Sequence, residues 1–386
     1  MAVGSVPSSE LIEISLEPSK ASLHQSVLLH DAVAGLFPVS KIPPQPPSEG
    51  IYVDATFGDG GHTFAILKAT TPHGRVIALD RDIEAINNGH QLASRMGIDP
   101  DRLTLIHAPF SQLNFILKKQ NITKVNAVLF DLGVSSRQLD TPHRGFSFHR
   151  DGPLDMRMDQ TVDHSGRLTT TAEHLLNHLT AEELAQIFYE FGEERFSRRI
   201  ARVIIDSRRT TPLTTTKQLA DLVRSCLPSQ KTGIHPATRV FQALRIAVNQ
   251  ELAELKTGLD AAMNAIETKG RVVVISFHSL EDRIVKTAFQ LAALPKQDNS
   301  GTMRAGRWIP TPQPLPLFQL ITKKPIMPSQ DEIRCNSRSR SAKMRIIERI
   351  APTGDQIGST NPLEPKRYHE CIEHPPHDTL IRSPRT

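Results

Sequence analysis

Short apolar runs alternate with helix-length amphipathic segments from Ile51 onward. The segments 83–96 and 111–120 have the length and periodicity of helices that cross over between parallel strands. This alternation predicts an α/β protein with a Rossmann-like parallel sheet. The runs with the length of buried strands are 51–55, 75–80, 103–107, 127–132 and 271–277.

Between the last two of these runs, residues 138–235 show helical rather than strand periodicity. Thr180 and Glu183 have the spacing of a capping box, and apolar residues follow them at helical intervals. We therefore expect an inserted all-helical subdomain for substrate recognition at 138–235. It would interrupt a sheet domain built from 23–137 and 236–350.

The rest of the chain predicts fewer regular elements. One further helix is expected over 237–266, and an edge strand within 341–350. Residues 1–22 are polar and 351–386 are proline-rich, so both ends are expected to be flexible. Residues 38–48 contain five prolines and are expected to form a surface loop.

Cysteine spacing, apolar run length and net charge exclude some classes of protein. Cys226, Cys335 and Cys371 lie far apart in sequence, which indicates neither a disulfide framework nor a zinc site. No apolar run is long enough to span a membrane and the N-terminus does not resemble a signal peptide, so we expect a cytoplasmic protein. The net charge of +5 is compatible with a polyanionic partner, but it is a mild excess.

A glycine-rich turn follows the first predicted strand, and Asp80 ends the second, twenty residues beyond Gly60. A carboxylate at this place in an α/β sheet binds ribose hydroxyls, as both nicotinamide cofactors and S-adenosylmethionine require. A dinucleotide site has glycine at the sixth position of its motif, where this chain has Thr63, and Asp59 would repel a pyrophosphate. The pattern favours the cationic cofactor S-adenosylmethionine.

Polar residues also follow the last two predicted strands. Asp131 and Ser135 come at the end of the fourth, where they either face a ligand crevice or cap a turn. After the fifth, Ser279 and Asp282 have the spacing of a helix cap. His278 beside them is either a packed ring or a substrate contact.

The segments 144–148 and 151–159 lack any regular period but are too apolar for disorder, so we interpret them as a lid or substrate loop. Phe146 and Phe148 either stack on a base or pack on the sheet.

Two groups of basic residues are either solvated faces or phosphate contacts, and the second, interleaved with Ser and Asn, more closely resembles an RNA-contacting segment. They are Arg195, Arg198, Arg202 and Arg209, and Arg334, Arg338, Arg340, Lys343 and Arg345.

Eight motifs in one order closely resemble the bacterial small-subunit (16S) rRNA cytosine N4-methyltransferase family, and the match spans about residues 26–349. Arg137 departs from the family pattern, which usually has proline there. The motifs are SVLL at 26–29, DATFGDGGH at 54–62, DLGVSS at 131–136, RGFSF at 144–148, DGPLDMRMD at 151–159, GEERF at 192–196, HPATR at 235–239 and SFHSLEDR at 276–283.

The resemblance implies a methyltransferase sheet with a helical insertion, S-adenosylmethionine as cofactor, no metal, and a decoding-site cytosine of 16S rRNA in the small subunit as substrate. It leaves open whether the protein is a monomer or a homodimer. The implied cofactor-binding residues are Gly60, Gly61, His62, Asp80, Phe110, Asp131 and Gln138.

For the reaction we expect direct transfer of the methyl group to the N4 amine, with acceptors at the Asp131 carboxylate and the Leu132 carbonyl. Ser135 and His278 are the further catalytic candidates. Two rival functions stay open at this point. One is an amino-methyltransferase acting on DNA, and the other is a ribosome-assembly factor that binds the cofactor without turnover.

Overall fold

The computed structural model describes residues 26–37, 49–70, 72–161, 170–227, 235–295, 301–304, 307–310 and 316–350. The predictions for 1–22, 38–48 and 351–386 lie outside the described residues.

A seven-stranded sheet of order β3-β2-β1-β4-β5-β9-β8 forms the centre of the protein. The first five strands of that order are parallel, so the predicted Rossmann-like class is confirmed. The prediction of an edge strand near the C-terminus was wrong in position, because β9 pairs antiparallel with both β5 and β8 and lies inside the sheet. The strands are β1 (Ile51–Asp54), β2 (Arg75–Asp80), β3 (Leu103–His107), β4 (Val125–Asp131), β5 (Ile266–Ser276), β8 (Phe318–Leu320) and β9 (Lys343–Arg349).

Helices cover both faces of the sheet, and two separate apolar clusters fill the two interfaces. Buried parallel strands need such cover, which explains their nearly continuous apolar sequences. One face packs against α1 (Leu29–Leu36), α2 (Gly61–Ala69) and α3 (Ile83–Arg95). The other packs against α4 (Leu113–Lys119), α11 (Glu251–Ala265) and α12 (Ser279–Ala292).

The chain reverses its direction of travel across the sheet between β1 and β4. β2 and β3 lie on one side of β1, while β4 and β5 lie on the other. Connections leaving the carboxyl ends of β1 and β4 therefore diverge, and a crevice opens between them. This topology sets the glycine-rich turn after β1 opposite the polar segment after β4.

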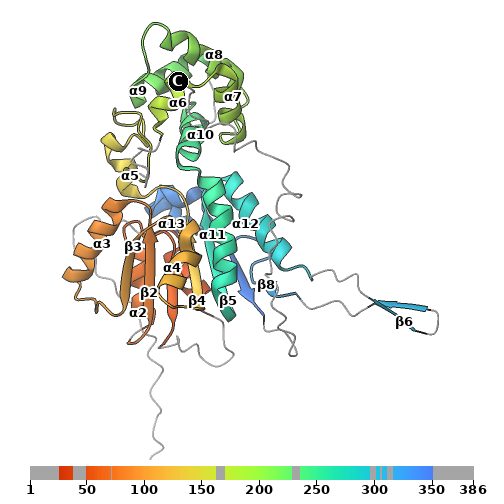
Figure 1. The fold of residues 1–386 in the computed structure, drawn as a ribbon. Coiled ribbons are helices and arrows are strands. Elements are labelled where there is room, and N and C mark those ends of the chain that lie inside the picture. Colours follow the sequence, from red (N-terminus) through yellow and green to blue (C-terminus); the bar gives the residue numbers. More distant parts are fainter. Residues whose placement is uncertain are drawn as a thin grey trace, which may run out of the picture.

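The predicted insertion is a helical layer at one end of the sheet, on the side where α5 (Ser136–Asp140) follows β4 (Figure 1). It has its own apolar core, to which the irregular loop contributes Phe146, Leu154, Met156 and Met158. Phe146 is buried, but it packs into the core of the insertion rather than on the sheet as one of the two expectations had it. The helices within the predicted bounds are α6 (Ala172–His178), α7 (Ala181–Glu190), α8 (Ser197–Arg208) and α9 (Thr216–Cys226). The helix α10 (Thr238–Asn249) packs into the same core, although it lies beyond the predicted boundary at residue 235.

The single helix expected over 237–266 is instead two helices, α10 and α11, because Gln250 adopts a left-handed conformation with φ of 52°. Asn249 explains the break. Its side-chain amide donates to the Met156 carbonyl and accepts from the Met158 N–H, each at 2.8 Å, and so holds the irregular loop. As a result, α10 packs into the core of the insertion and α11 packs on the sheet.

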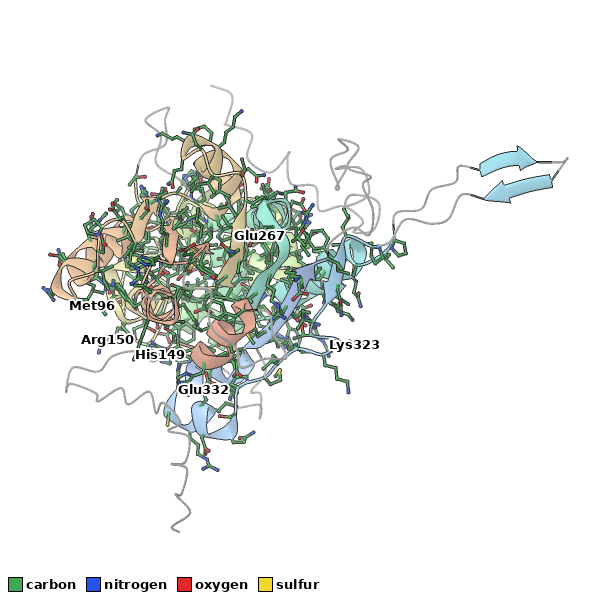
Figure 2. The ribbon with its side chains drawn as sticks, turned by 90° about the horizontal axis from the view of Figure 1, so that it is seen from below. Met96, His149, Arg150, Glu267, Lys323 and Glu332 are labelled. Atoms are coloured by element: carbon green, nitrogen blue, oxygen red, sulfur yellow. The ribbon has the colours of Figure 1, made fainter. Side chains whose placement is uncertain are left out.

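Smaller elements complete the described part of the chain. A hairpin of β6 (Gly301–Arg304) and β7 (Arg307–Pro310) stands apart from the main body (Figure 2). Short helical segments are Phe110–Gln112, Pro142–Arg144, α13 (Gln330–Cys335) and Ser337–Ser341. Among the described helices, none has the length and apolar character needed to cross a membrane.

Candidate active site

A cavity of about 370 Å³ lies at the carboxyl ends of β1, β2 and β4, and residues of α5, α11 and α12 complete its wall. This is the crevice that the strand order creates, and its size suits a small organic ligand. The predicted site residues that line it are Gly61, His62, Asp80, Phe110, Asp131, Ser135 and Gln138. Gly60 and His278 are not among the lining residues.

Gly60 shapes the turn before α2 instead. Its φ of 83° favours glycine, and a Cβ at this position would come within 2.6 Å of the Phe64 ring and 2.8 Å of the Phe57 ring. The glycine thus allows the backbone to turn closely beneath the cavity. The neighbouring Gly58 N–H donates to Asp80 Oδ2 at 2.7 Å, which fixes the turn against β2.

Asp80 ends β2 and accepts two backbone hydrogen bonds, from the Gly58 N–H and, at 2.8 Å, from the Asp82 N–H. Burial raises the pKa of Asp80 to about 6, although these two hydrogen bonds oppose the rise. Each carboxylate oxygen keeps a free lone pair. Asp80 can therefore accept hydrogen bonds from ribose hydroxyls, as the sequence predicts.

Asp131, at the end of β4, differs from Asp80 in having no donor. Among the described residues, none donates a hydrogen bond to either carboxylate oxygen, and Oδ1 is buried without a partner. Burial, followed by the charges of Asp54 and Glu281, raises the pKa of Asp131 well above its usual range. The carboxylate lines the cavity with its accepting capacity unused.

His62 is the nearest polar neighbour of that carboxylate, with Nδ1 lying 3.5 Å from Asp131 Oδ2. Its Nε2 lies 3.1 Å from the Val27 carbonyl, which can only accept, so the ring proton belongs on Nε2. Burial lowers the pKa of His62 to about 4, and the ring is neutral. Nδ1 therefore carries no proton and lies close to Asp131. It can accept a hydrogen bond from the Asp131 carboxyl group when that group is protonated.

The segment after β4 is organised by Ser135 and Gln138, which form a capping box on α5. The Gln138 amide also donates to Asp82 at 2.8 Å, so both ends of its side chain already have protein partners. Arg137, the departure from the family pattern, pairs with Asp59 at 3.0 Å. This ion pair joins α5 to the glycine-rich turn across the cavity.

Phe110 gives the cavity an apolar wall. Its ring packs edge-on against Phe130 with centroids 5.4 Å apart. Gly258 of α11 makes room for it, because a Cβ there would lie 2.5 Å from the Phe110 ring. A flat apolar wall in the same cavity as Asp80 suits a purine ring.

His278 is the N-cap of α12 and forms a capping box with Glu281. The prediction that Ser279 and Asp282 form this cap was wrong by one residue, because both have other partners. Ser279 donates to Glu193, and Asp282 pairs with Arg345. His278 therefore has a structural role, and it places Glu281 at the cavity wall.

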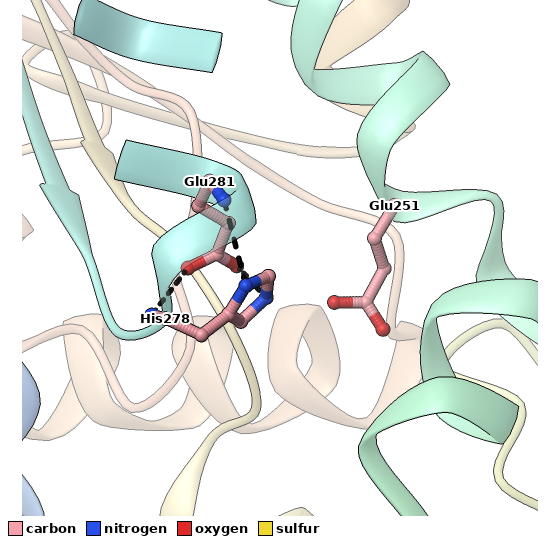
Figure 3. A group of neighbouring side chains, drawn as sticks. All are labelled: Glu251, His278 and Glu281. Carbon is pink, nitrogen blue, oxygen red and sulfur yellow. Dashed lines mark hydrogen bonds and ion pairs between the residues drawn. The ribbon is translucent and has the colours of Figure 1, made fainter. Parts of the chain in front are cut away.

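Glu251, His278 and Glu281 come close enough to form a possible cation site (Figure 3). However, the Arg245 guanidinium donates to both oxygens of Glu251, at 2.8 and 2.7 Å. Burial tends to raise the pKa of Glu281, but His278 and Arg245 together hold it below its usual range. The Arg245 guanidinium thus already compensates the charge of these two glutamates. This favours a network of ion pairs over a bound metal ion.

Arg144 is the main residue that the sequence interpretation missed. Its side chain is fully buried and pairs with Asp82 at 2.8 Å and Glu84 at 3.0 Å. It also donates to the carbonyls of Arg157 and Met158. It therefore joins the irregular loop to the turn after Asp80. Its place in the RGFSF motif of an irregular apolar segment is the signal that could have identified it in the sequence.

The two basic groups differ in the structure. In the second group, Lys343 and Arg345 pair with Asp282, and Arg338 pairs with Asp140, so most of its charge is compensated within the protein. Arg345 is buried and cannot reach a phosphate, which contradicts that part of the prediction. The arginines of the first group are exposed along α8.

The comparisons agree with this geometry. Residues 21–350 match the model of the MraW methylase family. Proteins named "Ribosomal RNA small subunit methyltransferase H" are similar to the chain. One from Magnetococcus marinus is 46% identical over 85% of this chain and 99% of its own length. One from Bradyrhizobium diazoefficiens is 48% identical over 79% and 88%. The chain therefore belongs to the MraW methylase family, and the predicted S-adenosylmethionine-dependent methyltransferase is confirmed.

Proposed function

We propose that this protein methylates the N4 amine of a cytosine in small-subunit (16S) rRNA. The observation that carries the proposal is Asp131, a cavity-lining carboxylate without a hydrogen-bond donor among the described residues. An exocyclic amine is a donor that can satisfy it, because carboxylates accept from cytosine N4. The names of the relatives supply the class of RNA.

S-adenosylmethionine fits the donor set of the cavity. Asp80 would accept hydrogen bonds from the ribose, Phe110 would pack on the adenine, and the turn at Gly58 to Gly61 would allow close approach of the backbone. The acidic wall formed with Glu254 complements a cation, and Oε2 of Glu254 is buried without a hydrogen-bond partner among the described residues. When bound, the cofactor supplies an electrophilic methyl group on sulfonium.

Asp131 and the Leu132 carbonyl accept the two hydrogens of the amine. The nitrogen lone pair, otherwise delocalised into the ring, is then available to the methyl carbon. After transfer, N4 releases one proton. Asp131 can take it because its pKa is raised, and the bare Nδ1 of His62, 3.5 Å away, can share it. Ser135 and His278 act by positioning α5 and Glu281.

Arg245 gives the site a means of choosing cytosine. Glu251 fixes its guanidinium by two hydrogen bonds, and the side chain lines the same cavity as Asp131. Cytosine offers an acceptor at N3 beside the donor at N4, whereas uracil offers the reverse pattern. A fixed donor beside an unfilled acceptor therefore matches cytosine and repels uracil. A flipped-out base would present this edge to the cavity.

The test is transfer of labelled methyl from S-adenosylmethionine to small subunits that lack the modification, followed by nucleoside mass spectrometry. Label in N4-methylcytidine of 16S rRNA, at a decoding-site position, is the expected result. Label in DNA without preference for subunits would instead support the DNA enzyme. Cofactor binding without label would support a ribosome-assembly factor. A cytoplasmic rRNA methyltransferase, as we propose, must transfer the labelled methyl group.

A further inference from the structure

We propose that one face of the α7–α8 hairpin binds the phosphate backbone of rRNA, outside the cavity where methyl transfer occurs. This inference rests on the proposed function, because it names the surface that holds the substrate of that site. The surface, called here the α8 face, consists of Arg195, Arg198, Arg199 and Arg202, all of which are exposed.

The charge of this face is uncompensated. Within the part of the chain that the structure describes, no carboxylate forms an ion pair with any of its four arginines. Arg198 and Arg202 are four residues apart, and like charges at this spacing destabilise a helix. The acidic residue further along the helix, Asp206, is matched by Arg209 at 3.3 Å. A polyanion would relieve the repulsion.

An aromatic side chain accompanies the arginines. Tyr189 of α7 is 66% exposed, although its helix packs closely against α8. Burial would be the usual outcome for a ring of this size beside an apolar interface. Proteins that bind single-stranded RNA combine exposed aromatic rings, on which unpaired bases stack, with arginines that bind phosphates, and α7 and α8 together offer both kinds of side chain.

The α8 face is linked to the cavity through the turn between its two helices. Glu193 in that turn has a φ of 49°, and its carboxylate accepts from Ser279 at 2.6 Å and from Arg283 at 3.0 Å. These residues belong to the first turns of α12, where Glu281 lines the cavity. RNA held on the face is therefore bound at a fixed position relative to the site.

The experiment compares Arg198→Glu/Arg202→Glu with Lys118→Glu/Lys119→Glu, a control that makes the same charge change at exposed positions of α4. Binding of 16S rRNA and of unmodified small subunits is measured over a salt series. We expect the first variant to bind roughly tenfold or more weakly. The slope of log affinity against log salt should fall by about 1.4–1.8, for two lost contacts. Affinity for S-adenosylmethionine should not change.

Tyr189→Ala separates stacking from charge. It should weaken binding roughly fivefold or more and leave the salt slope unchanged, because a ring carries no charge.

Three outcomes would overturn the proposal. The first is unchanged RNA binding by the Arg198→Glu/Arg202→Glu variant. The second is an equal loss in the control variant, which would make the effect one of total charge. The third is a loss with subunits but not with bare rRNA, which would assign the face to a ribosomal protein. Failure of the proposed function would differ from all three, because wild-type protein would then bind RNA without forming N4-methylcytidine.

Discussion

Arginine has two opposite uses in this protein. Arg144 is fully buried, with two carboxylates and two carbonyls as partners, whereas Arg198 and Arg202 are exposed on α8. Arg245 is intermediate, because Glu251 holds it in the wall of the cavity, where we propose that it also contacts the base. A buried guanidinium acts by fixing its neighbours, and an exposed one by offering charge to a partner. The comparison teaches that partners and burial, rather than residue type, decide whether the charge of an arginine is compensated within the protein or stays available to a ligand.

The largest expected effect is that of Arg144→Met. It leaves Asp82 buried without its cation, which should reduce the free energy of unfolding by about 3–5 kcal/mol. Arg198→Met is the exposed control and should change it by no more than about 0.5 kcal/mol. Urea unfolding of both variants measures the difference. Equal free energies of unfolding for the two variants would contradict the distinction between buried and exposed arginines.

Asp131→Asn comes next and tests the chemistry of the cavity. At saturating cofactor we expect kcat to fall by about 10²–10³, because the acceptor for the amine and its proton is lost. The KM for small subunits should hardly move, in contrast to the α8 variant. Asp221→Asn, at an exposed carboxylate on α9, is the control. Full turnover by Asp131→Asn would refute its role as acceptor.

A smaller effect is expected from removing Arg245, which we propose reads the base. Arg245→Met combined with Glu251→Gln avoids leaving a buried carboxylate unpaired. The rate of single-turnover methylation should fall roughly 10- to 100-fold, and cofactor affinity should stay the same. Wild-type rates in this double variant would mean that Arg245 only supports the fold.

The smallest expected effect is the dependence of the free energy of unfolding on pH. Burial raises the pKa of Asp54 to about 7 and that of Asp80 to about 6, so both stabilise the fold at low pH and lose that contribution as pH rises through these values. His62, with its pKa lowered to about 4, has the opposite effect, but only below pH 6.5. Through these two groups, ligand-free protein should therefore lose about 0.8 kcal/mol per pH unit near pH 7 and about 0.4 kcal/mol per pH unit near pH 7.5.

Urea unfolding between pH 6.5 and 8 measures this slope, with Asp54→Asn as the variant that should flatten it. A slope that persists in Asp54→Asn would mean that another group titrates in this range.

The sequence predicted the elements of the sheet well, because β-branched runs and the intervening helical periods are local properties. It placed β2 and β3 correctly and identified Asp80 and Asp131 from their positions at strand ends. It failed where a partner distant in sequence decides the outcome. At the end of α10, Asn249 binds the irregular loop, and the expected single helix ends there. Ser279 donates to Glu193 and so does not cap α12.

By itself, then, the sequence determined the fold class, the cofactor and the family, since these depend on local periodicity and on contiguous motifs. Only the tertiary structure decided which charged side chains form ion pairs within the protein. Arg345 is buried against Asp282, while the arginines of α8 have no such partner among the described residues. The physical reason is that the cost of burying a charge depends on groups brought together by folding, and no sequence spacing records that distance.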